Sequence, residues 1–217
     1  MQVHTHATRL SLPRRIATLA ALLVLTNAAM GLGGCAQRVR DIRAEHERRT
    51  QAMNETDPTA VLAGREPRVV LAHAMAGAGC IWRSKVIFTT AENHWDLNGY
   101  SYDAATRTLV TDSAYTYEKG LGVLGRGLSR AAIPLAEAKV FVSPPDPFGN
   151  VQCFEVRFHC IEKDCIHVDQ RHQDVDADHG TVIEESTKEI DSFSWRLLFK
   201  DEDDAVDAFA ALRALAD

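Results

Sequence analysis

The residues best suited to chemistry are cysteines and histidines near position 160. Cys160 and Cys165 flank the segment IEKD, and His159, His167 and His172 stand nearby. Four intervening residues suit a hairpin tip, where opposed strand residues lie about 4.5–5.5 Å apart at Cα, within reach of a disulfide. A zinc site usually needs a second closely spaced ligand pair, and none is clear. The spacing favours a Cys160–Cys165 disulfide, with free or differently paired thiols, or a metal site, as alternatives.

A second group of ionisable residues forms the acidic segment DVDADHGTVIEE. Asp174, Asp176 and Asp178 alternate, and Glu185 stands at the twelfth position, as do the ligands of an EF-hand calcium loop. His179 replaces the glycine that such a loop requires at its sixth position, and no amphipathic helix precedes the segment. We expect a solvated loop instead of a metal site, with the four acids as weak candidates only.

Two other motifs of catalytic proteins are matched poorly. The segment GLGVLGRG contains Gly120, Gly122 and Gly125, but more glycine and Pro134 follow where a dinucleotide-binding fingerprint would open a helix. A flexible loop is the simpler interpretation. The serines lack a nucleophile-elbow motif, and the histidines show no base-orienter pattern. We therefore assign no catalytic residue and no cofactor, although a triad assembled in space cannot be recognised from sequence.

A lone cysteine closes the apolar N-terminal region. Three arginines precede an apolar run over 16–32, which is the layout of a secretory signal. The segment LGGC, 32–35, resembles the lipobox of bacterial lipoproteins. This resemblance implies cleavage before Cys35 and acylation of Cys35, and Ala36 in place of aspartate implies sorting to the outer membrane, facing the periplasm. Two or three acyl chains suffice for stable anchoring. The alternative is an ordinary signal with an incidental cysteine.

Charge and cysteine content limit the class of protein. Without residues 1–34 the chain has 183 residues, 21 basic and 30 acidic, and a formal net charge of −9 with histidine neutral. That charge excludes a basic nucleic-acid footprint and disfavours broad contact with anionic lipid headgroups. Four cysteines remain besides Cys35, and an even number in an oxidising compartment indicates disulfides. Cys80 and Cys153 would form the second pair.

Three regions are expected to position these residues. Residues 1–34 form the signal peptide, and 35–67 hold the lipid anchor, a polar spacer helix over 36–53 and a linker. Residues 68–217 form a β-rich domain. Its apolar or alternating segments predict strands: RVVLAHAM, CIWRSKVIFTT, AEAKVFV, VQCFEVRFHC and SFSWRLLFK.

Between and after these strands we expect turns, a loop and one helix. Asn98-Gly99 predicts a turn, and 169–191 an acidic loop. The terminal segment DEDDAVDAFAALRALAD has apolar residues at helical spacing and acids in its first turn. Phe209 and Leu212 should be buried in the same core as Phe199 and Trp195.

The order of these elements resembles a known fold. The last third, over roughly 133–216, is similar to the second half of a pleckstrin-homology-like (PH-like) domain, in which antiparallel strands precede a terminal amphipathic helix. The predicted fold class is mainly β with α: a PH-like antiparallel β-sandwich or barrel capped by a C-terminal amphipathic helix and preceded by an N-terminal polar helix. Such modules bind lipids, peptides or proteins, or only scaffold, so the fold implies no single function.

The predicted role is therefore binding or scaffolding within the cell envelope. The expected partners are the membrane, through the lipid anchor, and an envelope protein. The first candidate surface consists of Leu121, Val123, Leu124 and Leu128 in the glycine-rich loop. The alternative is a hydrolase-like enzyme acting on envelope material, which would show a deep pocket with convergent polar groups.

Overall fold

The computed structural model describes residues 35–86, 89–120 and 122–217; the predicted signal peptide lies outside them. A boundary between Glu45 and His46 separates an N-terminal unit from a compact unit, His46–Asp217. Residues 35–55 are helical across that boundary. The compact unit contains the following elements: α2 (Pro58–Leu62), α3 (Pro67–Ala76), β1 (Gly79–Val86), β2 (Thr89–Asp103), β3 (Thr108–Gly120), β4 (Val123–Pro134), the 3-10 turn η1 (Leu135–Glu137), β5 (Ala138–Ser143), β6 (Phe154–Cys160), β7 (Ile166–Asp176), β8 (Val182–Ser192), β9 (Ser194–Phe199) and α4 (Glu202–Ala216).

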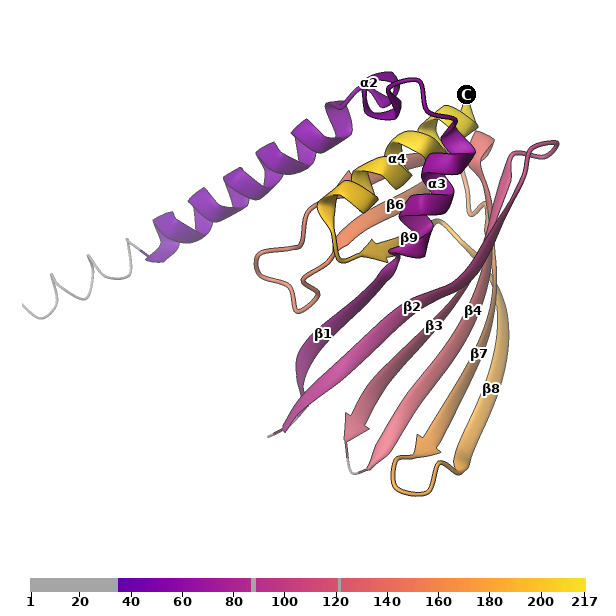
Figure 1. Cartoon of the computed structure of the whole chain (residues 1–217). Coiled ribbons are helices and arrows are strands. Elements are labelled where there is room, and N and C mark those ends of the chain that lie inside the picture. The colour runs from indigo at the N-terminus through magenta and orange to yellow at the C-terminus, as the bar shows by residue number, and fades with distance from the viewer. Residues whose placement is uncertain (1–34, 87–88, 121) are drawn as a thin grey trace, which may run out of the picture. The chain divides into compact units, whose positions relative to one another are not determined.

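The strands form two antiparallel sheets. The large sheet has the order β1-β2-β3-β4-β7-β8, and the small sheet has the order β5-β6-β9. Figure 1 shows α3 and α4 with the small sheet at one end of the large sheet, while the other ends of β2, β3, β4, β7 and β8 extend beyond them. The predicted mainly antiparallel β fold with a C-terminal helix is confirmed, and among the described residues no closed barrel is found. The PH-like resemblance stays a prediction.

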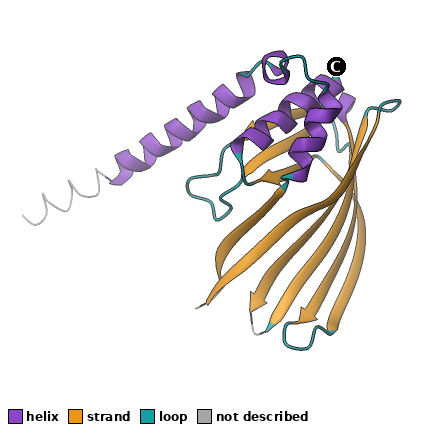
Figure 2. Cartoon of the chain, viewed as in Figure 1, coloured by secondary structure: helices purple, strands orange, loops and turns teal. Residues whose placement is uncertain are grey.

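The C-terminal helix belongs to the core, as predicted. α4 packs against α2 and α3 and against all three strands of the small sheet. Phe209 and Leu212 are fully buried, in one hydrophobic cluster with Phe199, and Trp195 packs against that cluster. Figure 2 shows α3 and α4 beside the short strands of the small sheet, at one end of the long strands of the large sheet.

Two elements before β1 differ from the expectation. The segment RVVLAHAM, predicted as a strand, lies in helix α3. The Glu66 side chain accepts hydrogen bonds from the backbone of Arg68 and Val69, and Pro67 occupies the first helical position, so helix-start signals outweigh the β-branched valines. In the predicted spacer and linker, Met53 and Leu62 are buried in the core.

The predicted acidic loop is also wrong, because 169–191 lies mostly within the hairpin of β7 and β8. β8 is an edge strand of the large sheet and is exposed along nearly its whole length, so it needs no apolar alternation. Asn98-Gly99 does not form a turn either. β2 continues through it with a register shift between Leu97 and Gly99, which is a β-bulge or a similar irregularity.

Two disulfides are present, one between distant parts of the chain and one across a short loop, and they are the pairs expected from the sequence. Cys80 bonds to Cys153, with their Cα atoms 6.1 Å apart, and Cys160 bonds to Cys165, with their Cα atoms 5.7 Å apart. The expected hairpin tip is absent, because Cys160 ends β6 in the small sheet and β7 lies in the large sheet. The short disulfide therefore closes the crossover between the two sheets.

Candidate functional site

One face of the large sheet carries the hydrophobic core, and we call it the inner face. Burial along this face decreases toward the C-terminal end of β3. On β3, Leu109 and Thr111 have no exposed surface and Ser113 is 2% exposed, whereas Tyr115 and Tyr117 are half-buried. The core elements therefore cover one end of the inner face and leave the other end partly open.

The open end holds an aromatic cluster, Tyr115, Tyr117 and His172. The β4 partners of the two tyrosines are Gly127 and Gly125. A Cβ atom at Gly127 would lie 2.0 Å from the Tyr115 ring, and one at Gly125 would lie 2.5 Å from the Tyr117 ring. The rings thus occupy space that β4 side chains would otherwise take. The three rings are nearly parallel, with centroids 5.9–6.3 Å apart.

A chain of polar contacts joins this cluster to two charged residues. His172 Nε2 lies 2.9 Å from Asp174 Oδ1, and Lys119 Nζ lies 2.7 Å from the same carboxylate. In a neutral imidazole the carboxylate fixes the hydrogen on Nε2 and leaves Nδ1 as an acceptor. The Tyr115 hydroxyl oxygen lies 3.5 Å from that Nδ1, at the outer limit of a hydrogen bond. His172 therefore has one preferred orientation between phenol and carboxylate.

The protonation states of the residues in this series of polar contacts suit ligand binding better than nucleophilic chemistry. Burial raises the pKa of Tyr115, and Tyr117 raises it further. The hydrogen bond from Lys119 lowers the pKa of Asp174, and that contact raises the pKa of Lys119. At neutral pH the site holds a protonated phenol, a carboxylate and an ammonium group. A basic or nucleophilic tyrosine needs a lowered pKa, so the Tyr115 hydroxyl is suited to hydrogen bonding: it donates to His172 Nδ1 in this tautomer and can accept a hydrogen bond from a ligand.

A cleft of about 510 Å³ opens beside Trp95, which is the direct cross-strand partner of Tyr115. Glu155 pairs with both arginines of the cleft, with Arg157 at 2.5 Å and with Arg196 at 3.1 Å. The cleft therefore combines indole rings with guanidinium groups, next to the aromatic cluster. Its remaining lining residues come from β6 and β9: Arg157, His159, Ser194, Trp195 and Arg196.

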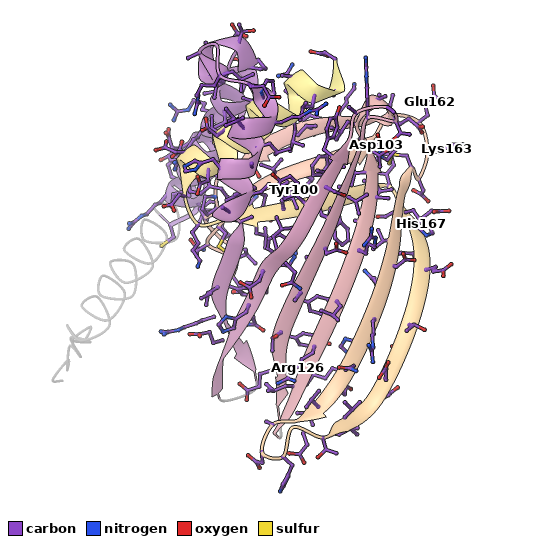
Figure 3. All side chains as sticks on the ribbon, turned by 45° about the vertical axis from the view of Figure 1, so that its right-hand side comes forward. Tyr100, Asp103, Arg126, Glu162, Lys163 and His167 are labelled. Carbon is purple, nitrogen blue, oxygen red and sulfur yellow. A yellow bond between two sulfur atoms is a disulfide. The ribbon has the colours of Figure 1, made fainter. Side chains whose placement is uncertain are left out.

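The groups most suited to a metal ion lie on the opposite face of the large sheet. His167 and Asp169 of β7 and Glu189 of β8 bring potential ligand atoms within 4.8 Å of one another. Asp191 pairs with His167 at 3.2 Å, and this hydrogen bond raises the pKa of His167. Figure 3 shows His167 on the side of the sheet formed by β7 and β8. All these side chains are exposed and solvated, so we assign no metal centre to them.

The four acids considered as calcium ligands are not brought together. Asp174 belongs to the inner-face chain described above. Asp176 accepts hydrogen bonds from the backbone of Asp178 and His179, which closes the β7–β8 turn. Glu185, on β8, pairs with Arg171 at 2.7 Å. These carboxylates have separate partners, whereas a calcium loop directs them toward one centre.

The glycine-rich segment is not the flexible loop that the sequence suggested. Its residues from Val123 onward form β4, in the middle of the large sheet between β3 and β7. The missing side chains make room for tyrosine rings. The proposed apolar patch also fails to form one surface, because Val123 and Leu124 are half-buried on opposite faces and only Leu128, at 50%, is well exposed. Leu121 lies outside the described residues.

The sequence did not single out the aromatic cluster. A signal for it exists: Tyr115 and Tyr117 alternate in SAYTYEKG, and Gly125 and Gly127 alternate in LGRG. Two such patterns on neighbouring antiparallel strands indicate rings lying over glycines. The pairing of β4 with β7, which brings in His172, joins strands that are separated in the sequence by β5 and β6 and is not visible in either pattern.

Cys35, the first described residue, is exposed and takes no part in a disulfide. Its acylation stays a prediction. Within the described segments no helix combines the length and the apolar composition needed to cross a membrane. No protein-family model, curated protein or solved structure matches the chain.

Proposed function

We propose that this chain is a lipid-anchored envelope lipoprotein that acts as a binding module through the open end of its inner face. The observation that carries the proposal is the aromatic cluster. Half-buried tyrosine rings rest on glycines, and a protonated phenol, a carboxylate and an ammonium group lie beside them. Aromatic surface next to fixed polar groups is typical of ligand sites.

The anchor gives this module its place of action. The LGGC segment supports acylation of Cys35, and the exposed position of Cys35 at the start of the described chain is compatible with an anchor there. Tethering confines the module near a surface and raises the effective concentration of any partner held at the same surface.

The second candidate function is a hydrolase-like enzyme. The contact series Tyr115–His172–Asp174 favours it, because a histidine between a hydroxyl and a carboxylate is the arrangement of a proton relay. Against it stand the raised pKa of Tyr115 and the openness of the surface. An enzyme would lose turnover of its ligand in Asp174→Asn while still capturing it, whereas a binding module would show no turnover in either form.

The test compares two adjacent positions of β3 that point to opposite faces. A photoreactive phenylalanine derivative replaces Tyr117 on the inner face or Glu118 on the other face, in the full chain within its native envelope. We expect crosslinked product at position 117 and little at 118. Cys35→Ala should abolish acyl labelling and membrane association and reduce the product at 117. Equal crosslinking at both positions, or product only at 118, would refute a role for the inner face.

A further inference from the structure

We infer that the cleft between Trp95 and the small sheet binds an acidic amphiphile, that is, a phosphate or carboxylate group attached to an apolar body. The inference rests on the binding role proposed above and names its ligand class. Trp95 connects the cleft to the aromatic cluster, because it lines the cleft and pairs across the strands with Tyr115 of that cluster.

The first observation is the charge of the small sheet. Alternation along its strands places polar residues on the face away from the core, and Glu155 is the single acid among these strand positions. The cations on the same face are Lys139, Arg157 and Arg196. This local excess of positive charge occurs in a chain whose formal net charge is −6. A positive region on an acidic protein concentrates anions at that place.

The second observation is the position of the two arginines. Arg157 and Arg196 are direct cross-strand partners on β6 and β9. Like charges placed opposite each other destabilise a sheet. Glu155 offers one carboxylate oxygen to each guanidinium, and a guanidinium has five N–H donors. An added phosphate or carboxylate balances the remaining charge and fits the planar donor fork of arginine.

The third observation is the aromatic surface around the arginines. Trp95 and Trp195 line the cleft itself. His159 contacts Phe141 and Phe193 at centroid distances of 5.6 and 5.7 Å, and the two phenylalanines are 40% and 48% exposed. An inorganic anion would leave this apolar surface in water, whereas the apolar body of an amphiphile would cover part of it.

The ligand class is tested by calorimetric titration of the full-length protein in a nonionic detergent. The probes are hexyl phosphate, inorganic phosphate and hexanol. We expect saturable binding of hexyl phosphate, binding of inorganic phosphate weaker by about tenfold or more because no alkyl chain is buried, and no saturable binding of hexanol. Equal affinity for the two phosphates, or no binding of hexyl phosphate, would overturn the inference.

A second pair of probes identifies the source of the ligand. Dihexanoyl phosphatidylglycerol carries an anionic lipid headgroup, and dihexanoyl phosphatidylcholine is its zwitterionic control. Binding of the first but not the second supports a membrane lipid as ligand. Binding of hexyl phosphate alone supports a soluble amphiphile. Equal binding of both lipids would contradict recognition of the anionic group.

Variants then locate the site. Arg157→Gln and Arg196→Gln should each weaken hexyl phosphate binding by about tenfold, the loss expected for charge-assisted hydrogen bonds. Arg130→Gln is the matched control, because Arg130 is an exposed arginine paired with Asp112 outside the cleft. Glu155→Gln removes the competing carboxylate and should tighten binding severalfold.

The direction of the Glu155→Gln effect decides the case even where an arginine variant fails to fold, which circular dichroism would reveal. Unchanged or weaker binding in Glu155→Gln would contradict the proposed site. Crosslinking at position 117 without any hexyl phosphate binding would remove the ligand class and leave the binding role. Arginine-dependent binding of hexyl phosphate without crosslinking at position 117 would support the ligand class and refute the role proposed for the inner face.

Discussion

Replacing Gly127 by alanine tests whether the Tyr115 ring rests on β4. The new Cβ atom would lie 2.0 Å from ring atoms, a distance that no pair of non-bonded carbon atoms tolerates, so the ring must swing away. Tyr115 would then lose its ring contacts with Tyr117 and His172, each worth about 0.5–1.5 kcal/mol. Alanine in a strand regains about 0.5–1 kcal/mol relative to glycine. We expect a net loss of about 1–2 kcal/mol in the free energy of unfolding.

The assay is urea denaturation under non-reducing conditions, carried out as a double-mutant cycle with Tyr115→Ala. Once the ring is absent, Gly127→Ala should become neutral or stabilising, so the two changes should couple by about 2 kcal/mol. Gly99→Ala in β2 is the matched control, because nothing lies within 4 Å of its Cβ position. Additive effects of Gly127→Ala and Tyr115→Ala would refute the packing of this ring on the glycine.

Four further outcomes follow from burial, disulfides and charge. Phe209→Ala should cost about 3–5 kcal/mol, because the side chain is 1% exposed, and a loss below about 1 kcal/mol would contradict its place in the core. Replacing Cys80 and Cys153 by serine should cost about 4 kcal/mol, since the disulfide spans 73 positions, and non-reducing peptide mapping should recover it beforehand. Thr111→Val should stabilise the protein by about 1 kcal/mol in the same denaturation assay, because the buried hydroxyl of Thr111 has no hydrogen-bond partner. Asp174→Asn should destabilise at neutral pH, and the difference should vanish as the pH falls below 3.8 through the lowered folded-state pKa; a pH-independent difference would exclude the ion pair as its cause.

Sequence patterns predicted those elements in which local signals and tertiary packing agree. Strand alternation in β6 and the apolar stripe of α4 reflect burial, and Val156, Phe158 and Phe209 are indeed buried. The even number of cysteines reflects their pairing in disulfides. The pattern failed in α3, where capping by Glu66 and Pro67 overrode β-branched residues. It also failed in β8, where solvent on both sides of an edge strand removes the alternation on which the prediction depends.

The candidate site was harder to predict because its parts meet through pairing of distant strands. Arg157 and Arg196 oppose each other across β6 and β9, which are separated in sequence by the whole β7–β8 hairpin. The small sheet is thus interrupted by two strands that join the large sheet. No local period in the sequence carries that information, since it depends on register between non-consecutive strands.

The edge position of β8 has a consequence for the behaviour of the protein at high concentration. An edge strand has unpaired backbone donors and acceptors along one side, and it can extend into the sheet of a neighbouring copy. β8 is 11 residues long, and its charged residues are Glu184, Glu185, Lys188, Glu189 and Asp191. Approach of two such strands brings mostly like charges together, which opposes self-association at neutral pH. Protonation of these carboxylates would remove that barrier, so acidic conditions should promote edge-to-edge aggregation before the core itself unfolds.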